Sequence, residues 1–175
     1  MASIARAGFW RMALPAMVAI AAAGSLSGYL SNSGYSNAWF AALDKPSFMP
    51  PGWVFGVAWT TLYALMGLAL ALVSSSPPSQ EHTAALRLFF AQLAVNFAWS
   101  PIFFGAHLVE VGLLAILLMF ALAAITAWRF TRVRPLAGML LVPYLAWLCL
   151  ATALNFEIGR LNPGSDAMPL GLFGG

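Results

Sequence analysis

Trp53-Val-Phe-Gly-Val-Ala-Trp59-Thr-Thr-Leu-Tyr63 follows Pro50-Pro51 and opens a stretch that carries no charged residue as far as about residue 74. Roughly 20 apolar residues are enough for a helix to cross the ~30 Å hydrocarbon core of a bilayer. At 100° per residue, Phe55 and Tyr63 each lie within about 40° of Trp59 on such a helix. Lipid does not require an aromatic stripe, so the stripe predicts a flat apolar ligand or a tightly packed helical neighbour.

The composition indicates a membrane protein. The chain is 62% hydrophobic and 7% charged, against ~25% charged residues in soluble domains. Five charge-poor stretches have membrane-spanning length, and we expect helices at about 10–31, 53–74, 83–104, 108–129 and 135–157. Helices satisfy their own backbone hydrogen bonds, as the bilayer demands. The predicted fold is all-α, an integral membrane bundle of five transmembrane helices that forms a single domain over residues 1–175.

The basic residues predict the orientation of the bundle rather than a nucleic-acid surface, because they are scattered along the chain or flank the expected helices. Lys45 and Arg160 fall on one side of the five-span topology, and six arginines fall on the other. Those six are Arg6, Arg11, Arg87, Arg129, Arg132 and Arg134. The positive-inside rule then places the N-terminus in the cytoplasm and the C-terminus outside, in a cell membrane that we expect to be bacterial.

The first expected helix also has features of a signal peptide, since Arg6 and Arg11 precede an apolar run and then Ala21-Ala-Ala-Gly-Ser. The apolar run continues past this small-residue segment, and no charged residue occurs between Arg11 and Asp44. Gly24 and Gly28 would suit close packing between helices. We therefore expect a retained helix. At the other end of the chain, the glycine-flanked tail is expected to fray.

The loop at about 32–52 is the longest expected connection. Long loops in compact bundles are usually functional or disordered, and aromatic residues such as Trp39 argue against disorder. Pro46, Pro50 and Pro51 also restrict its freedom. The loop is predicted to fold as a lid on the non-cytoplasmic end, and the alternative is an interfacial aromatic belt.

The third expected helix carries two opposed faces. Gln92 and Asn96 share one face with Phe89 and Trp99, and buried amides in a membrane need partners, so this face should look into the bundle. Gln92 and Asn96 would either bind a ligand or join neighbouring helices. The opposite face predicts a helix–helix seam, within the bundle or between subunits. Its residues are Arg87, Ala91, Ala94 and Ala98.

The fifth expected helix repeats the inward stripe. Its members are Leu140, Tyr144, Trp147, Ala151, Leu154 and Ile158, with Asn155 at the edge. Pro143 removes one helical hydrogen bond and is expected to bend the helix. Glu157 and Arg160 are expected to form a structural ion pair. Glu110 is expected near the start of the fourth helix, where its negative charge would stabilise the positive end of the helix dipole.

Three blocks resemble the tryptophan-rich sensory protein family, TspO/MBR, whose animal member is the translocator protein or peripheral benzodiazepine receptor. They are Asp44-Lys-Pro-Ser-Phe-Met-Pro-Pro-Gly-Trp-Val-Phe with Trp59 to Tyr63, Gln92-Leu-Ala-Val-Asn96-Phe-Ala-Trp-Ser-Pro, and Pro143-Tyr-Leu-Ala-Trp147 through Asn155. The blocks occur in family order. The resemblance extends from the first helix to about Asn162.

The resemblance implies a pocket under the first loop that binds porphyrins such as protoporphyrin IX, related tetrapyrroles, sterols including cholesterol, and drug-like ligands. By position, Trp59 and Trp147 match the two tryptophans that the family associates with ligand binding and light-dependent porphyrin breakdown. Tyr63, Asn96 and Ala151 match pocket positions. The resemblance also implies a homodimer, formed in bacteria through the third helix. The ligand-binding candidates, from the stripes and the resemblance together, are Trp39, Phe55, Trp59, Tyr63, Phe89, Gln92, Asn96, Trp99, Tyr144, Trp147, Ala151, Leu154 and Asn155.

Two departures from the family pattern bear on the ligand. The animal cholesterol-recognition pattern needs a tyrosine where this chain has Phe156, and such patterns are weak evidence even when complete. This difference favours a tetrapyrrole over a sterol. Phe48 also stands where many relatives have tryptophan. No required cofactor and no metal site are expected, because His82 and His107 fall at opposite ends of the third helix.

Two classes of function remain open from the sequence. The first is a membrane receptor or sensor that binds, and in one version transports, a porphyrin-like ligand. The second is a light- and oxygen-dependent enzyme that degrades porphyrin, with Trp59 and Trp147 as candidate catalytic residues. A secondary transporter is a weaker third alternative, because the chain shows no internal repeat.

Overall fold

The computed structural model describes residues 2–173, with side chains from residue 8 onward. All regular structure in this part of the chain is helical. The elements are α1 (Ala2–Leu30), α2 (Ala38–Ala42), α3 (Gly52–Ser74), α4 (Gln80–Ser100), the π-helix η1 (Pro101–Gly105), α5 (Val109–Val133), α6 (Pro135–Met139) and α7 (Val142–Leu161).

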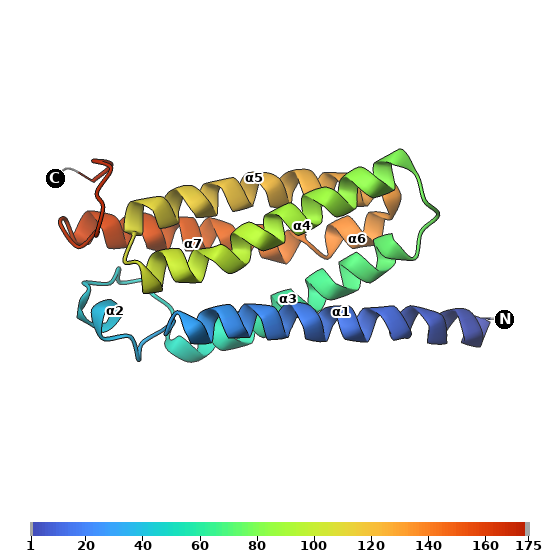
Figure 1. The fold of residues 1–175 in the computed structure, drawn as a ribbon, viewed down its shortest axis with the longest axis horizontal. Helices are drawn as coiled ribbons and strands as arrows, with labels where there is room; N and C mark the ends of the chain where they lie inside the picture. The colour runs from blue at the N-terminus through green and yellow to red at the C-terminus, as the bar shows by residue number, and fades with distance from the viewer. Residues whose placement is uncertain (1, 174–175) are drawn as a thin grey trace.

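Five segments of the described chain are long and apolar enough to cross a membrane, as the sequence predicts. They are Gly8–Leu30, Gly52–Ser74, Gln80–Gly105, Val109–Val133 and Pro135–Leu161. Figure 1 shows these spans running along the long axis of the bundle, with α2 at one end and the α3–α4 loop at the other. We call the end that carries α2 the lid end, and the end that carries the α5–α6 turn the arginine end.

Prolines interrupt two of the five spans. Pro101 begins the π-helix, in which the Ala106 N–H donates to the Pro101 carbonyl at 2.8 Å. Pro143 has no N–H to offer the carbonyl of Met139, so the last span divides into α6 and α7. The predicted bend at Pro143 is therefore a break in the helix. The turn between the two pieces is held by a hydrogen bond from the Leu141 N–H to the Gly138 carbonyl at 3.1 Å.

Glycines allow close approach between helices of the bundle. A Cβ atom at Gly67 of α3 would lie 2.6 Å from the backbone of Met17 in α1. Gly24 of α1 faces the ring of Tyr63, so the predicted small surface on α1 does receive a neighbour. At the arginine end, Phe89 of α4 stacks on Phe130 of α5 with ring centres 5.6 Å apart. The contacts of Gly67 and Phe89 make the bundle densely packed toward the arginine end, whereas Gly24 lies on the lid side of the middle.

The loop at 32–52 is folded over the lid end. Asn37 caps α2 by accepting the Phe40 N–H at 3.1 Å, and its own amide donates to the Phe104 carbonyl at 3.2 Å. Trp39 stacks on His107, with ring centres 4.3 Å apart and planes inclined by 12°. These contacts fasten the loop to η1 and to the turn that follows it.

The expectation that the C-terminal tail frays is wrong for the described residues up to Phe173. Glu110 is buried, and its carboxylate accepts the backbone N–H groups of Leu170 at 2.5 Å and Leu172 at 3.2 Å. Asp166 in turn accepts the N–H of Glu110 at 2.7 Å. Glu110 therefore anchors the tail in addition to lying in the first turn of α5, where the sequence places it. The predicted Glu157–Arg160 ion pair is confirmed at 2.8 Å.

Gly67→Ala should destabilise the bundle, because its methyl group would meet the rigid backbone of Met17 rather than a movable side-chain tip. Overpacking of this kind costs about 1–3 kcal/mol. We expect a lower midpoint of thermal unfolding in detergent. Gly56→Ala is the matched control on the same helix, since a Cβ there meets nothing within 4 Å. Equal midpoints for the two variants would contradict the assignment of Gly67 to a close crossing.

Candidate functional site

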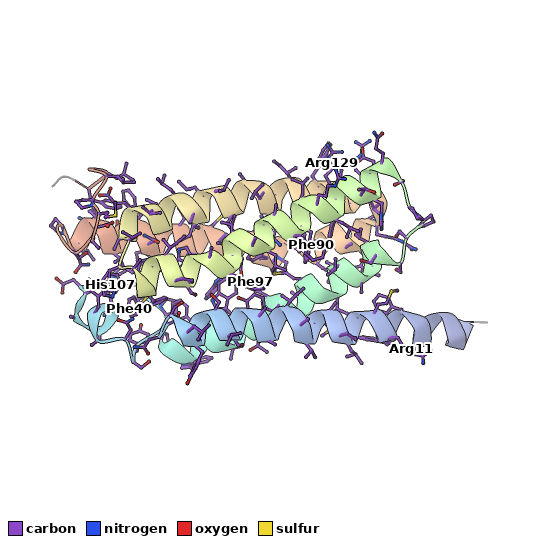
Figure 2. The ribbon with its side chains drawn as sticks, viewed as in Figure 1. Arg11, Phe40, Phe90, Phe97, His107 and Arg129 are labelled. Carbon is purple, nitrogen blue, oxygen red and sulfur yellow. The ribbon has the colours of Figure 1, made fainter. Side chains whose placement is uncertain are left out.

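A cavity of about 420 Å³ lies in the lid half of the bundle. Its walls come from α1, α3, α4, η1, α5 and α7. The folded loop closes it with Phe40, Met49 and the Ser33-Gly34 turn. The loop therefore forms part of the cavity roof. In Figure 2, Phe40 and His107 mark the lid end, while Arg129 and Arg11 mark the opposite end.

Asn96 is the polar centre of the cavity wall. It is 5% exposed. Its carbonyl oxygen accepts the Tyr63 hydroxyl at 3.2 Å, and its amide donates to the Tyr144 hydroxyl at 3.0 Å and to the Met119 sulfur at 3.5 Å. One side chain of α4 is thereby joined to α3, α5 and α7, which fixes its orientation and theirs.

Aromatic rings form one corner of the cavity. The ring centres of Trp59 and Trp147 are 6.3 Å apart, with planes inclined by 77°. Phe55 meets Trp147 edge-on at 5.6 Å, and Tyr63 lies 5.2 Å from Trp59. A flat ligand stacked on the face of one indole would meet the edge of the other, and aromatic groups favour both contacts.

A second polar point lies nearer the lid. Asn155 is 2% exposed and lines the cavity. Its amide donates to the Val109 carbonyl at 2.9 Å, and its Oδ1 is buried without a hydrogen-bond partner among the described residues. Beside it, Gly112 leaves room that a Cβ would close, because that atom would lie 3.1 Å from Oδ1. An unsatisfied acceptor is costly away from water, and Oδ1 itself is covered by neighbouring residues and not exposed to the cavity.

Nine of the thirteen residues proposed from the sequence line this cavity. They are Phe55, Trp59, Tyr63, Asn96, Trp99, Trp147, Ala151, Leu154 and Asn155.

The other four lie outside its lining. Phe89 and Gln92 share the face of Asn96 but lie deeper, and Phe89 stacks on Phe130 in the core. Tyr144 is buried behind Asn96 as its hydrogen-bond partner, and Trp39 packs on His107 at the lid. Helical periodicity correctly predicts that Phe89 and Gln92 face into the bundle. It does not predict at which level along the bundle the helices move apart to form the cavity.

Other lining residues were not proposed from the sequence. Ile116 and Met119 come from α5, whose sequence is so uniformly apolar that no inward stripe stands out. Ala21, Gly24 and Ser25 come from α1. The glycines of this segment predict close packing between helices, and the small size of all three residues also leaves space for the cavity.

Comparison with known families now adds to this geometry. A sequence model of the TspO/MBR family matches residues 16–161, which cover part of the first span and all of the other four. The chain belongs to the TspO/MBR family.

Individual relatives of this TspO/MBR chain occur in bacteria and animals. The chain is 42% identical to protein CrtK of Rhodobacter capsulatus over 154 residues, covering 87% of this chain and 94% of that protein. It is 44% identical to the tryptophan-rich sensory protein of Cereibacter sphaeroides, covering 71% and 77% of the two chains. It is also 44% identical to the human translocator protein, covering 72% and 76%. Together with the five apolar helices, family membership identifies an integral membrane protein.

Tyr144→Phe should destabilise the bundle without filling or emptying the cavity, because it removes the oxygen that accepts from the Asn96 amide. Hydrogen bonds between membrane helices average about 0.6 kcal/mol and reach about 1.7 kcal/mol. We expect a loss within that range in a reversible unfolding assay in detergent or bicelles. Tyr29→Phe is the control, since Tyr29 is 82% exposed on α1. A Tyr144 variant as stable as the Tyr29 variant would show that the Asn96 contact carries no net stability.

Proposed function

We propose that this TspO/MBR chain is a membrane receptor or sensor that binds a porphyrin-like tetrapyrrole, such as protoporphyrin IX, in the aromatic cavity. The observation that carries the proposal is the corner formed by Trp59 and Trp147, whose edge-to-face arrangement suits a large flat ring. The names of the relatives, tryptophan-rich sensory protein and translocator protein, support a sensing or carrying role.

The shape of the aromatic corner favours a tetrapyrrole over a sterol. The flat macrocycle of a porphyrin can lie face-on against one indole of the Trp59–Trp147 corner and meet the edge of the other. The fused rings of a sterol are puckered and make a poorer contact with an aromatic face. Phe156 is 46% exposed and has no hydroxyl with which to bind a sterol outside the cavity. Sterols and drug-like molecules remain secondary ligands in this proposal.

Degradation of porphyrin with light and dioxygen is the second candidate function. It is favoured by the contact between three oxidisable rings, with Tyr63 at 5.2 Å and Trp147 at 6.3 Å from Trp59. In this case, dioxygen is the oxidant and the illuminated porphyrin is the molecule that is oxidised, and Trp59 and Trp147 would supply electrons or radical sites to the reaction.

Trp59→Phe and Trp147→Phe should each weaken protoporphyrin IX binding, because phenylalanine presents a smaller face and no N–H. Stacking of a nucleic-acid base on an aromatic side chain contributes about 1–3 kcal/mol, and a loss of about 1.4 kcal/mol raises the dissociation constant tenfold. Binding should be followed by porphyrin absorbance in the dark, since tryptophan fluorescence changes with the mutation itself. Trp10→Phe is the control, because Trp10 is exposed on α1 and does not line the cavity.

The same samples under illumination separate the two functions. Absorbance that persists in light supports a receptor, whereas oxygen-dependent loss that disappears in the Trp variants supports degradation. Dark binding and illuminated spectra of both variants equal to those of the parent would refute the aromatic cavity as the porphyrin site.

We also propose that the chain forms a homodimer through the exposed face of α4 and that the arginine end faces the cytoplasm of a bacterial cell. Arg87, Ala91, Ala94 and Ala98 are all exposed, so this small-residue face is free to receive a second copy. The distribution of Lys and Arg supports the orientation.

Ala94→Phe should weaken the dimer in detergent, because a ring cannot fit a close crossing of helices. Ala153→Phe adds the same ring to an exposed position of α7 and serves as the control. Mass measured by light scattering should fall toward one protomer for Ala94→Phe alone. A dimer that survives Ala94→Phe unchanged would refute this seam.

A further inference from the structure

The arginine end of α5 presents a tryptophan ring in contact with two cations. Trp128 is 53% exposed. The guanidinium carbons of Arg129 and Arg132 lie 5.1 and 5.3 Å from the centre of its ring. Such cation–π contacts hold guanidinium groups near the ring. Figure 2 shows Arg129 at this end of the bundle, far from Phe40 and His107.

The positive charge at this point is only partly compensated. Arg129 pairs with Glu81 at 2.7 Å, and the Nε of Arg134 donates to the Ser76 hydroxyl at 3.0 Å. Arg132 is exposed, and no carboxylate of the described chain lies within ion-pair distance of it. Three arginines against one glutamate leave an excess of positive charge that faces outward.

The exposed surface of α5 continues from these cations as an apolar stripe. At 100° per residue, Trp128, Ile125, Ala121 and Leu118 all lie within about 40° of Arg132. Each of the four is exposed. The rise from Leu118 to Trp128 is about 15 Å, which is half of the ~30 Å hydrocarbon core and so the depth of one leaflet.

We propose that this surface binds an anionic phospholipid in the leaflet at the arginine end. The phosphate contacts Arg132 and Arg129, the glycerol region lies beside Trp128, and one acyl chain follows the stripe toward Leu118. Tryptophan is enriched at this depth in membranes, and basic residues on the cytoplasmic side attract anionic headgroups. A soluble phosphate would use the arginines but not the stripe.

The charge also distinguishes between lipid classes. Phosphatidylcholine brings a cation beside its phosphate, and the uncompensated arginines repel that cation. Phosphatidylglycerol brings a phosphate and neutral hydroxyl groups. A second copy of the same face is disfavoured as the occupant, because it would oppose arginine to arginine.

The test is native mass spectrometry of the full-length protein with equimolar phosphatidylglycerol and phosphatidylcholine. We expect the parent to retain phosphatidylglycerol preferentially, and Arg132→Gln to lower that preference about fivefold. Arg132→Lys should keep most of it, because the charge remains. Trp128→Leu should lower it as well, since both guanidinium groups lose the ring that holds them.

The N-terminal helix supplies matched controls at the same end. Trp10 and Arg11 form an exposed pair of the same residue types on α1, and among the side chains described from residue 8 onward no guanidinium lies over the Trp10 ring. Arg11→Gln and Trp10→Leu should leave the preference unchanged. Equal losses from the α1 and α5 variants would overturn the proposal in favour of a general surface potential. An absent preference in the parent, or glycerol phosphate that competes as well as the whole lipid, would also overturn it.

Discussion

The constraint on which most of the structure depends is that a polar group inside a bilayer is costly unless it has a partner within the protein. Asn96 meets this constraint with three partners from three other helices, Tyr63, Met119 and Tyr144. Each of these bonds sets the depth and rotation of a helix as well as the position of a side chain. The wall of the cavity is therefore held by the same contacts that hold the bundle together.

Packing divides the bundle on either side of Asn96. Toward the arginine end, the backbone of Met17 lies against Gly67, and Phe89 stacks on Phe130, so little space remains. Toward the lid, small residues of α1 and α7, including Gly24 and Ala151, face large rings that touch edge to face and leave space between them. A cavity in one half of a five-helix bundle thus follows from the order of small and large residues along each helix.

Most of the fold could be predicted from the sequence, because charge-free runs of bilayer length have few alternatives to a helix. Periodicity also placed Trp59, Asn96 and Trp147 on inward faces. It could not place Gln92 at the correct depth, since an angle around a helix says nothing about where neighbouring helices diverge. It also missed the anchoring of the tail, because Glu110 binds the N–H groups of Leu170 and Leu172, about 60 residues further along the chain.

The lid is attached to the bundle beside Pro101, through the π-helix that begins there. Pro101 lacks an N–H, and the chain at the end of α4 forms the π-helix η1 rather than another α-helical turn. The carbonyl of Phe104 lies in the last turn of that segment, where a helix leaves its carbonyl groups unpaired. The amide of Asn37 donates to this carbonyl while its oxygen caps α2. Asn37 thus pairs the free carbonyl of η1 and also caps the N-terminus of α2. Phe40, which belongs to α2, lines the cavity as a result. Pairing of buried polar groups therefore sets both the wall of the site, through Asn96, and its roof, through Asn37.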